Sequence, residues 1–332
     1  MNVIELFAGA GGSALGLEAA GFKHLACIEN DPDSCETLRA AGLPCVEADV
    51  RDPGIYESRW VGEALLWSSF PCKGWSTSGL REGSRDPRNG FPWTVDVIDA
   101  LEPQWFAAEN VIGLTQHKGE CWGGCRGVGG CSRAYLDRVI LGQLRERFAW
   151  VGWRVLDAAD FGVPQHRRRV IIVGGPRPIS WPEPTHGSPR EIRQVDLFGR
   201  TLLPWASSGD ELRLEGILHT GGEDYRERPD RKDRERPAPT SEPGPTVGSR
   251  GNTMITSSRG ERRRLTVEEC AALQGFPPNH PFQGNITSQH RQVGNAVPPK
   301  MAEVVGRAIF RDSSTETPQP ASGSDTESHQ RS

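Results

Sequence analysis

Short apolar runs recur along the first half of the chain, with helix-compatible segments between them. The runs are residues 3–6, 25–28, 65–67 and 105–108, and a further run covers residues 170–173. This alternation is typical of a doubly wound α/β sheet, in which a helix follows each strand. Ligands bind such sheets beyond the carboxyl ends of the strands, so the residues just after each run are the first candidates for a functional site.

Composition divides the chain of 332 residues into four parts. Residues 1–174 carry the strand–helix rhythm, whereas Pro, Gly, Arg, Asp and Glu dominate residues 175–245 and predict a second, smaller domain. Residues 246–311 return to the first domain, because Thr266 and Glu269 have the spacing of a capping box and an apolar helix face follows Pro298. Residues 312–332 have the composition of a disordered tail.

Bulk properties exclude some classes of protein. No apolar run approaches the roughly 20 residues that cross a bilayer, and the first residues lack the basic region of a signal peptide. The eight cysteines lie at irregular spacings, which predicts reduced thiols rather than a disulfide scaffold. We therefore expect a cytoplasmic monomer without a membrane segment. The net charge of -4 neither favours nor excludes a nucleic-acid partner.

The first apolar run ends in a glycine-rich loop, Phe-Ala-Gly-Ala-Gly-Gly, at residues 7–12. Glycines here indicate that the backbone comes close to a ligand. Gly9, Gly11 and Ala14 also fit the dinucleotide pattern G-x-G-x-x-A, so an NAD-dependent enzyme is an alternative at this point. Glu29 follows the second run, where an acid can accept hydrogen bonds from both ribose hydroxyls, and Asp49 follows a third possible strand, where it can accept from an adenine amino group.

Reactive side chains follow the later runs. Cys72 lies between Pro71 and Lys73 after the fourth expected strand, residues 65–67, where positive charge and backbone amides can favour a thiolate. Glu109 ends the fifth expected strand, so the sheet brings a carboxylate to the same edge. Cysteine and acid together indicate covalent catalysis with proton transfer. In Gln-His-Arg-Arg-Arg, residues 165–169, alternation places the first, third and fifth side chains on one face.

Six segments occur in one order: Phe-Ala-Gly-Ala-Gly-Gly at 7–12, Phe-Pro-Cys at 70–72, Glu-Asn-Val at 109–111, Val-Pro-Gln-His-Arg-Arg-Arg at 163–169, a helical segment at 265–277, and Gln-Val-Gly-Asn-Ala-Val-Pro-Pro at 292–299. Together they resemble the motifs of the DNA (cytosine-5) methyltransferase family. The resemblance implies a mixed, Rossmann-like sheet of the S-adenosylmethionine-dependent kind. It also implies a target recognition domain at residues 175–245.

The resemblance implies a reaction as well. The enzyme transfers a methyl group from S-adenosylmethionine to carbon 5 of a cytosine flipped out of double-stranded DNA, through a covalent adduct with Cys72 at carbon 6. Glu109 contacts the ring nitrogen and the exocyclic amino group, Arg169 lies near the carbonyl oxygen, and Arg167 supports the site. By the same resemblance, Asn110 orders the Pro71 loop, and Gln165 is one of the catalytic residues. The setting is restriction–modification, with a cognate endonuclease as a possible partner, or phage DNA protection.

The resemblance also predicts the cofactor residues. These are Phe7, Ala8, Gly9, Gly11, Gly12, Glu29, Asn30, Asp49, Val50, Asn295 and Val297. Phe7 faces the sulfonium, Glu29 the ribose and Asp49 the adenine, while Asn295 and Val297 close the pocket. Two positions depart from the family pattern: Lys73 stands where many members carry Gln, and Asn30 stands where an aromatic side chain often stacks on adenine.

An insertion after residue 111 contains potential zinc ligands, namely His117, Cys121, Cys125 and Cys131. Their spacing matches no common zinc motif, so a loop that contacts DNA is the preferred interpretation and no metal is expected. Two alternatives to a DNA methylase stay open. An RNA methylase is one, because tRNA-modifying relatives share the motifs, and an NAD-dependent oxidoreductase is the other, although it leaves Cys72, Glu109 and the last two motifs unexplained.

Overall fold

The computed structural model describes residues 1–62, 65–71, 89–116, 131–193, 201–220 and 238–314. Its centre is a seven-stranded sheet in the order β3-β2-β1-β4-β5-β7-β6. All pairings are parallel except those of β7, which runs antiparallel to β5 and β6. The strands are β1 (Asn2–Leu6), β2 (Lys23–Glu29), β3 (Cys45–Glu47), β4 (Leu65–Ser68), β5 (Trp105–Val111), β6 (Trp150–Asp157) and β7 (Arg168–Gly175). The expected mixed α/β sheet is confirmed.

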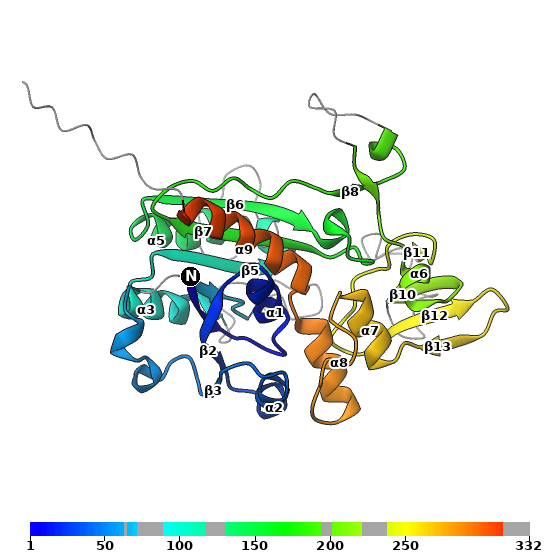
Figure 1. Ribbon diagram of the computed structural model, residues 1–332, viewed down its shortest axis with the longest axis horizontal. Helices are drawn as coiled ribbons and strands as arrows, with labels where there is room; N and C mark the ends of the chain where they lie inside the picture. Colours follow the sequence, from blue (N-terminus) through cyan, green and yellow to red (C-terminus); the bar gives the residue numbers. More distant parts are fainter. Residues whose placement is uncertain (63–64, 72–88, 117–130, 194–200, 221–237, 315–332) are drawn as a thin grey trace, which may run out of the picture.

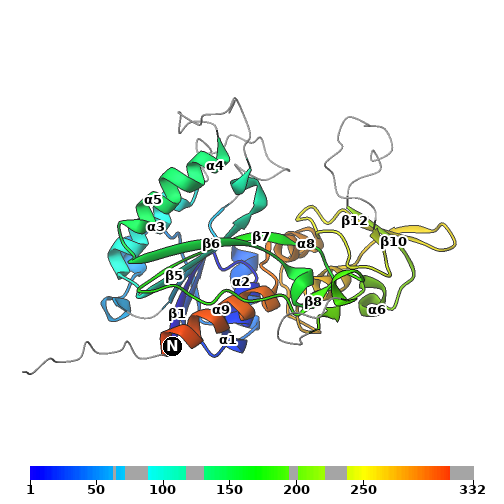
Figure 2. The same cartoon turned by 90° about the horizontal axis from the view of Figure 1, so that it is seen from above.

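Helices cover both faces of this sheet, as Figure 2 shows. On one face, α1 (Gly12–Ala19) and α9 (Pro299–Ser314) pack together over a cluster that includes Leu17, Trp67 and Met301. On the other face lie α3 (Phe91–Leu101), α4 (Ser132–Ala134) and α5 (Leu141–Arg145), and a π-helical turn joins the last two. The helix α2 (Pro32–Ala40) packs beside α1 through Leu38. The last helix of the described residues, α9, thus completes the core of the first part.

A smaller, antiparallel sheet lies to one side of the main sheet in both views (Figures 1 and 2). Its order is β11-β10-β12-β13, and its strands are β10 (Gly216–Thr220), β11 (Ala238–Pro239), β12 (Thr253–Ser257) and β13 (Arg262–Arg264). The short strands β8 (His186–Gly187) and β9 (Leu203–Pro204) pair beside it, and α6 (Ser208–Leu212) precedes β10. Because β12 and β13 follow residue 245, the predicted boundary there does not coincide with an end of this sheet.

Two helices connect the smaller sheet to the main one. α7 (Val267–Leu273) begins with the expected capping box between Thr266 and Glu269, which confirms that prediction. α8 (Ile286–Asn295) follows it, and Leu218 and Ile255 of the small sheet share one apolar cluster with residues of both helices. The smaller sheet therefore rests on the same helices that lead the chain back into the main domain.

Two details differ from the sequence prediction. The strand β6 was not expected, because five of its eight residues are polar, glycine or aromatic and the strand has no continuous apolar run. The helix α9 includes Asp312, where a disordered tail was expected to begin. The Asp312 carboxylate accepts a hydrogen bond from the backbone nitrogen of Ser180 at 2.7 Å, which holds this end of the helix against the preceding chain. Residues 315–332 lie outside the described residues.

Candidate active site

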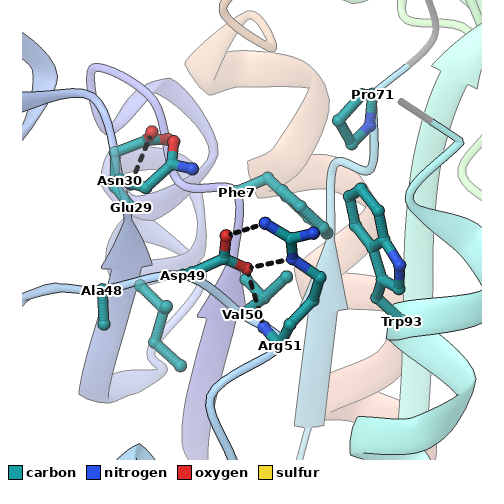
Figure 3. Close-up of a pocket in the computed structure, with 10 residues that line it drawn as sticks. Phe7, Glu29, Asn30, Ala48, Asp49, Val50, Arg51, Pro71 and Trp93 are labelled. Carbon is teal, nitrogen blue, oxygen red and sulfur yellow. Dashed lines mark hydrogen bonds and ion pairs between the residues drawn. The ribbon is translucent and has the colours of Figure 1, made fainter. Parts of the chain in front are cut away.

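A cavity of about 350 Å³ opens at the carboxyl ends of β1, β2 and β4, next to β3 and the N-terminal part of α3 (Figure 3). It is the position at which an α/β sheet of this topology binds ligands. The lining residues are Phe7, Ile28, Glu29, Asn30, Ala48, Asp49, Val50, Arg51, Pro71 and Trp93. Five of the predicted cofactor residues and the predicted catalytic Pro71 therefore meet in one place, although they come from four different segments of the chain.

The loop after β1 has an unusual backbone. Phe7, Gly9 and Gly11 all have positive φ, at 57°, 55° and 80°. This conformation is strained for phenylalanine and easy for glycine. A side chain at Gly12 would also place its Cβ 2.3 Å from the carbonyl oxygen of Val297, so only glycine allows the chain after α8 to pack here.

The Glu29 carboxylate is held by backbone amides. Its Oε2 accepts from Gly9 at 2.8 Å, while Oε1 accepts from Asn30 at 2.8 Å and from Asp31 at 2.9 Å. A carboxylate has about four lone-pair sites, so roughly one remains, on Oε2. The sequence predicts that Glu29 accepts hydrogen bonds from both hydroxyls of a ribose. In this arrangement the Glu29 carboxylate keeps one unused acceptor direction, which is enough for one of the two hydroxyls.

Asp49 is paired with Arg51, which the sequence prediction missed. The Nε of Arg51 lies 2.9 Å from Asp49 Oδ1 and its Nη2 lies 2.5 Å from Oδ2, while the Arg51 backbone nitrogen also donates to Oδ1 at 2.9 Å. The side-chain hydrogen bonds from Arg51 hold the pKa of Asp49 below its usual value. The Arg51 guanidinium stacks on the ring of Trp93, with 4.9 Å from Cζ to the ring centroid. Figure 3 shows it between Asp49 and Trp93.

Glu109 and Arg169 form an ion pair at the end of β5. Antiparallel pairing places Val111 opposite Arg169, so the two charged side chains are diagonal neighbours on adjacent strands. Arg169 Nε lies 2.6 Å from Glu109 Oε1, and each side chain is only 12% exposed. A pair that is so well shielded keeps a fixed orientation and a strong local field. The structure brings these two predicted catalytic residues together.

Asn110, the next residue, is buried and points toward the β4 loop. Its Nδ2 donates to the carbonyl oxygen of Phe70 at 3.2 Å, directly before Pro71. This contact ties the end of β5 to the loop that leads to the predicted nucleophile. Cys72 itself lies outside the described residues, as do His117, Cys121 and Cys125 of the predicted zinc set. Cys131 of that set is buried before α4.

Gln165 and Arg167 are buried at the junction of the two sheets, and neither belongs to the described lining of the cavity. Gln165 donates to the carbonyl oxygen of Leu273 at 3.2 Å and accepts from the nitrogen of Val247 at the same distance. Arg167 donates to the carbonyl oxygens of Val247, Gly294 and Ala296, at 3.2, 2.8 and 2.8 Å. The expected alternation is present, but the guanidinium groups of Arg167 and Arg169 serve different partners.

The remaining predicted cofactor residues do not belong to the described lining of the cavity. Ala8 is buried, and its nitrogen donates to the carbonyl oxygen of Ile28 at 3.1 Å. Asn295 is exposed at the end of α8, and Val297 is buried against the glycine loop. Conversely, Ile28, Ala48, Arg51 and Trp93 line the cavity but were not predicted. The signal for Arg51 was its place two residues after Asp49, just beyond a strand end, whereas no sequence signal pointed to Trp93.

Comparison with known proteins gives a consistent result. The family model of C-5 cytosine-specific DNA methylases matches residues 1–194 and 206–311. The Type II methyltransferase M.NaeI of Lentzea aerocolonigenes is 32% identical over 331 residues, which cover 93% of this chain and 74% of that protein. The Type II methyltransferase M.NgoMIV of Neisseria gonorrhoeae is also 32% identical, with 93% of this chain and 96% of that protein covered.

Solved structures with low sequence identity share the fold. The Dnmt2 methyltransferase of S. pombe superimposes with a TM-score of 0.65 at 16% identity, covering 95% of this chain and 100% of that one. A prophage-encoded protein of E. coli, described as a DNA modification methyltransferase, gives a TM-score of 0.60 at 20% identity, with 94% and 99% covered. Among the described helices, none combines the length and the apolar composition that a membrane span requires.

Proposed function

Because the chain belongs to the family of C-5 cytosine-specific DNA methylases, we propose that it uses S-adenosylmethionine to methylate cytosine within a specific sequence of double-stranded DNA, with Cys72 as nucleophile. The observation that carries the proposal is the pairing of Glu109 with Arg169 at the same strand edge as the cavity that holds Phe7, Glu29 and Asp49. The proposed catalytic pair and the proposed cofactor cavity thus both lie at the carboxyl edge of the same sheet.

The cavity residues suit S-adenosylmethionine. The cavity has two hydrogen-bond acceptors that match donors of the ligand. Glu29 Oε2 can accept from a ribose hydroxyl, and Asp49 can accept from the adenine amino group. Phe7 offers an aromatic ring, which favours a sulfonium cation. When bound, S-adenosylmethionine supplies an electrophilic methyl group. The protein residues bind it, orient it and shield it from water.

The chemistry at the cytosine follows from the remaining residues. The Cys72 thiolate forms a bond to carbon 6, which makes carbon 5 electron-rich enough to be methylated. Glu109 contacts ring nitrogen 3 and the exocyclic amino group, and Arg169 at 2.6 Å keeps the Glu109 carboxylate in one orientation. Loss of the proton from carbon 5 and cleavage of the bond between sulfur and carbon 6 then release the methylated base. Asn110 holds the loop before Cys72 through the Phe70 carbonyl group.

The smaller sheet supports a role in target recognition. We propose that the target recognition domain, predicted at residues 175–245, extends to residue 264 and so includes β12 and β13. The three arginines of β13 are exposed. Arg263 pairs with Glu269, while Arg262 and Arg264 lie on the other face of the strand, where their guanidinium groups can contact phosphates and guanine edges. A restriction endonuclease that cuts the same sequence is the expected partner. The proposal predicts that DNA methylated by this protein resists that endonuclease.

The test is methyl transfer from labelled S-adenosylmethionine to unmethylated genomic DNA and, in parallel, to tRNA. The wild type is compared with Cys72→Ser and with Cys45→Ser as a matched control, because Cys45 lies on β3 outside the proposed machinery. We expect 5-methylcytosine in DNA from the wild type and the control, and none from the Cys72 variant. Label in tRNA alone would replace the DNA substrate by RNA, and full activity of Cys72→Ser would remove the proposed nucleophile.

A further inference from the structure

The Asp49 carboxylate has little acceptor capacity left. Arg51 supplies three donors, of which two occupy Oδ1 and one occupies Oδ2. With two lone pairs on each oxygen, a single direction remains, on Oδ2. An amino group of a ligand can donate to it without displacing Arg51. A ligand that presents an acceptor in the same place would meet a carboxylate that cannot turn away.

Arg51 is itself fixed from the far side. Its guanidinium lies over the ring of Trp93, 4.9 Å from the centroid, and a cation in this position is attracted by the face of the ring. Trp93 in turn packs against the apolar cluster under α3. The chain that links Trp93, Arg51 and Asp49 therefore sets the orientation of one carboxylate from a rigid helix (Figure 3).

The residue after Glu29 increases the importance of the Asp49 carboxylate for recognition of the purine. Asn30 lines the cavity there, and an amide offers no broad aromatic surface for a purine ring. Discrimination among purines must then depend more on hydrogen bonds at the edge of the ring than on stacking at this wall.

We propose that Arg51 is a positioning residue which, with Trp93, makes the cofactor site selective for the amino group of adenine. The inference rests on the proposed function, because it concerns the same cavity. Arg51 does not touch the reacting atoms. It presents the one unused lone pair of Asp49 to the adenine amino group, and the Asp49 carboxylate, held in that orientation, repels a purine that carries a carbonyl group in that place.

The test compares two ligands on the full-length protein by calorimetry. One is S-adenosylhomocysteine, and the other is S-inosylhomocysteine, in which an oxo group replaces the amino group. The wild type should bind the adenine compound about 10- to 100-fold more tightly, the usual range for a hydrogen bond to a charged group. In Arg51→Ala the ratio of the two dissociation constants should fall several-fold, since Asp49 can then rotate. Trp93→Leu should lower the ratio less, and Arg51→Lys should restore part of it.

Arg59→Ala is the matched control. Arg59 is also exposed and also pairs with an acid two residues earlier, Glu57, but neither belongs to the described lining of the cavity. Its ratio should equal that of the wild type. An unchanged ratio in Arg51→Ala, with methyl transfer intact in the wild type, would overturn this inference alone. If the wild type binds neither compound, the proposed function fails and the inference fails with it.

Discussion

The guanidinium of Arg169 on β7 lies 2.6 Å from the carboxylate of Glu109 on β5, although the two residues are far apart in sequence. The contact exists because β7 runs antiparallel to β5 and brings its first residues to the end where β5 carries its acid. Because β7 is antiparallel to β5, the first residues of β7 lie at the carboxyl end of β5. The Arg169 guanidinium thereby reaches the edge of the sheet that carries Glu109.

This pair leads to a prediction for catalysis. Glu109→Gln keeps the shape of the side chain and removes its charge, so Arg169 loses its ionic partner and the cytosine loses its charged contact. We expect the single-turnover rate of methyl transfer to fall by about 100-fold or more, with the dissociation constant of S-adenosylhomocysteine unchanged. Asp99→Asn is the control. Asp99 lies on α3 and also forms an ion pair with an arginine, Arg147, at 2.5 Å, but it has no proposed role in catalysis. Equal rates for the two variants would contradict the role of Glu109.

Arg167 leads to a prediction for stability. Its guanidinium is 1% exposed and satisfies three buried carbonyl groups. Lysine keeps the charge but cannot reproduce the planar fork. Arg167→Lys should lower the free energy of unfolding by about 3 kcal/mol, since each buried acceptor without a partner costs roughly 1–3 kcal/mol. Urea denaturation measures this change. Arg168→Lys, at the exposed neighbouring position, should leave the midpoint unchanged, and a similar loss there would show that the contacts of Arg167 are not its cause.

His166 gives the protein a pH-dependent contribution to stability. Its Nδ1 lies 3.0 Å from Asp157 Oδ2, and this hydrogen bond raises the pKa of His166 above its usual value of 6.5. A raised pKa in the folded state stabilises the protein below the unfolded pKa, and the contribution disappears as pH rises through the folded pKa. The stability difference between the wild type and His166→Gln should therefore be largest near pH 5.5 and shrink above pH 6.5, roughly the unfolded pKa. Denaturation curves at several pH values would refute this if the difference grew with pH.

Gly12 leads to a prediction for the cofactor loop. A Cβ at this position would lie 2.3 Å from the carbonyl oxygen of Val297, and backbone cannot easily move away. Gly12→Ala should reduce stability by about 1–3 kcal/mol, as overpacking does, and should weaken binding of S-adenosylhomocysteine. Gly142→Ala is the control, because a Cβ there meets no atom within 4 Å. Thermal melts with and without ligand measure both effects, and normal binding by Gly12→Ala would separate the loop from the cofactor.

Much of this molecule follows from local sequence. The strands β1, β2, β4, β5 and β7 appear where continuous apolar runs predict them. Phe7, Glu29 and Asp49 meet in one cavity because each follows a strand of the same sheet, and the topology brings strand ends together. The edge strand β6 was missed, since glycine, arginine and aspartate interrupt its apolar residues and leave no continuous run.

Contacts between distant segments were not predictable in the same way. The sequence pattern places Arg167 and Arg169 on one face. Arg167 nevertheless donates its hydrogen bonds to the backbone carbonyl groups of Val247, Gly294 and Ala296, which come from segments distant in sequence. Trp93 lines the cavity and forms a cation–π contact with Arg51. This contact depends on how close α3 lies to the end of β3. Such pairings are set by tertiary packing and leave no periodic trace in the chain.

The contact between Gly12 and Val297 also orders events during synthesis. The loop after β1 is synthesised long before its packing partner, because Val297 follows β13, α7 and α8 in the chain. Until α8 and α9 are translated, the nascent protein lacks the wall on which that loop rests. A nascent fragment that ends before α8 should thus be inactive, because the loop after β1 lacks the contact with Val297.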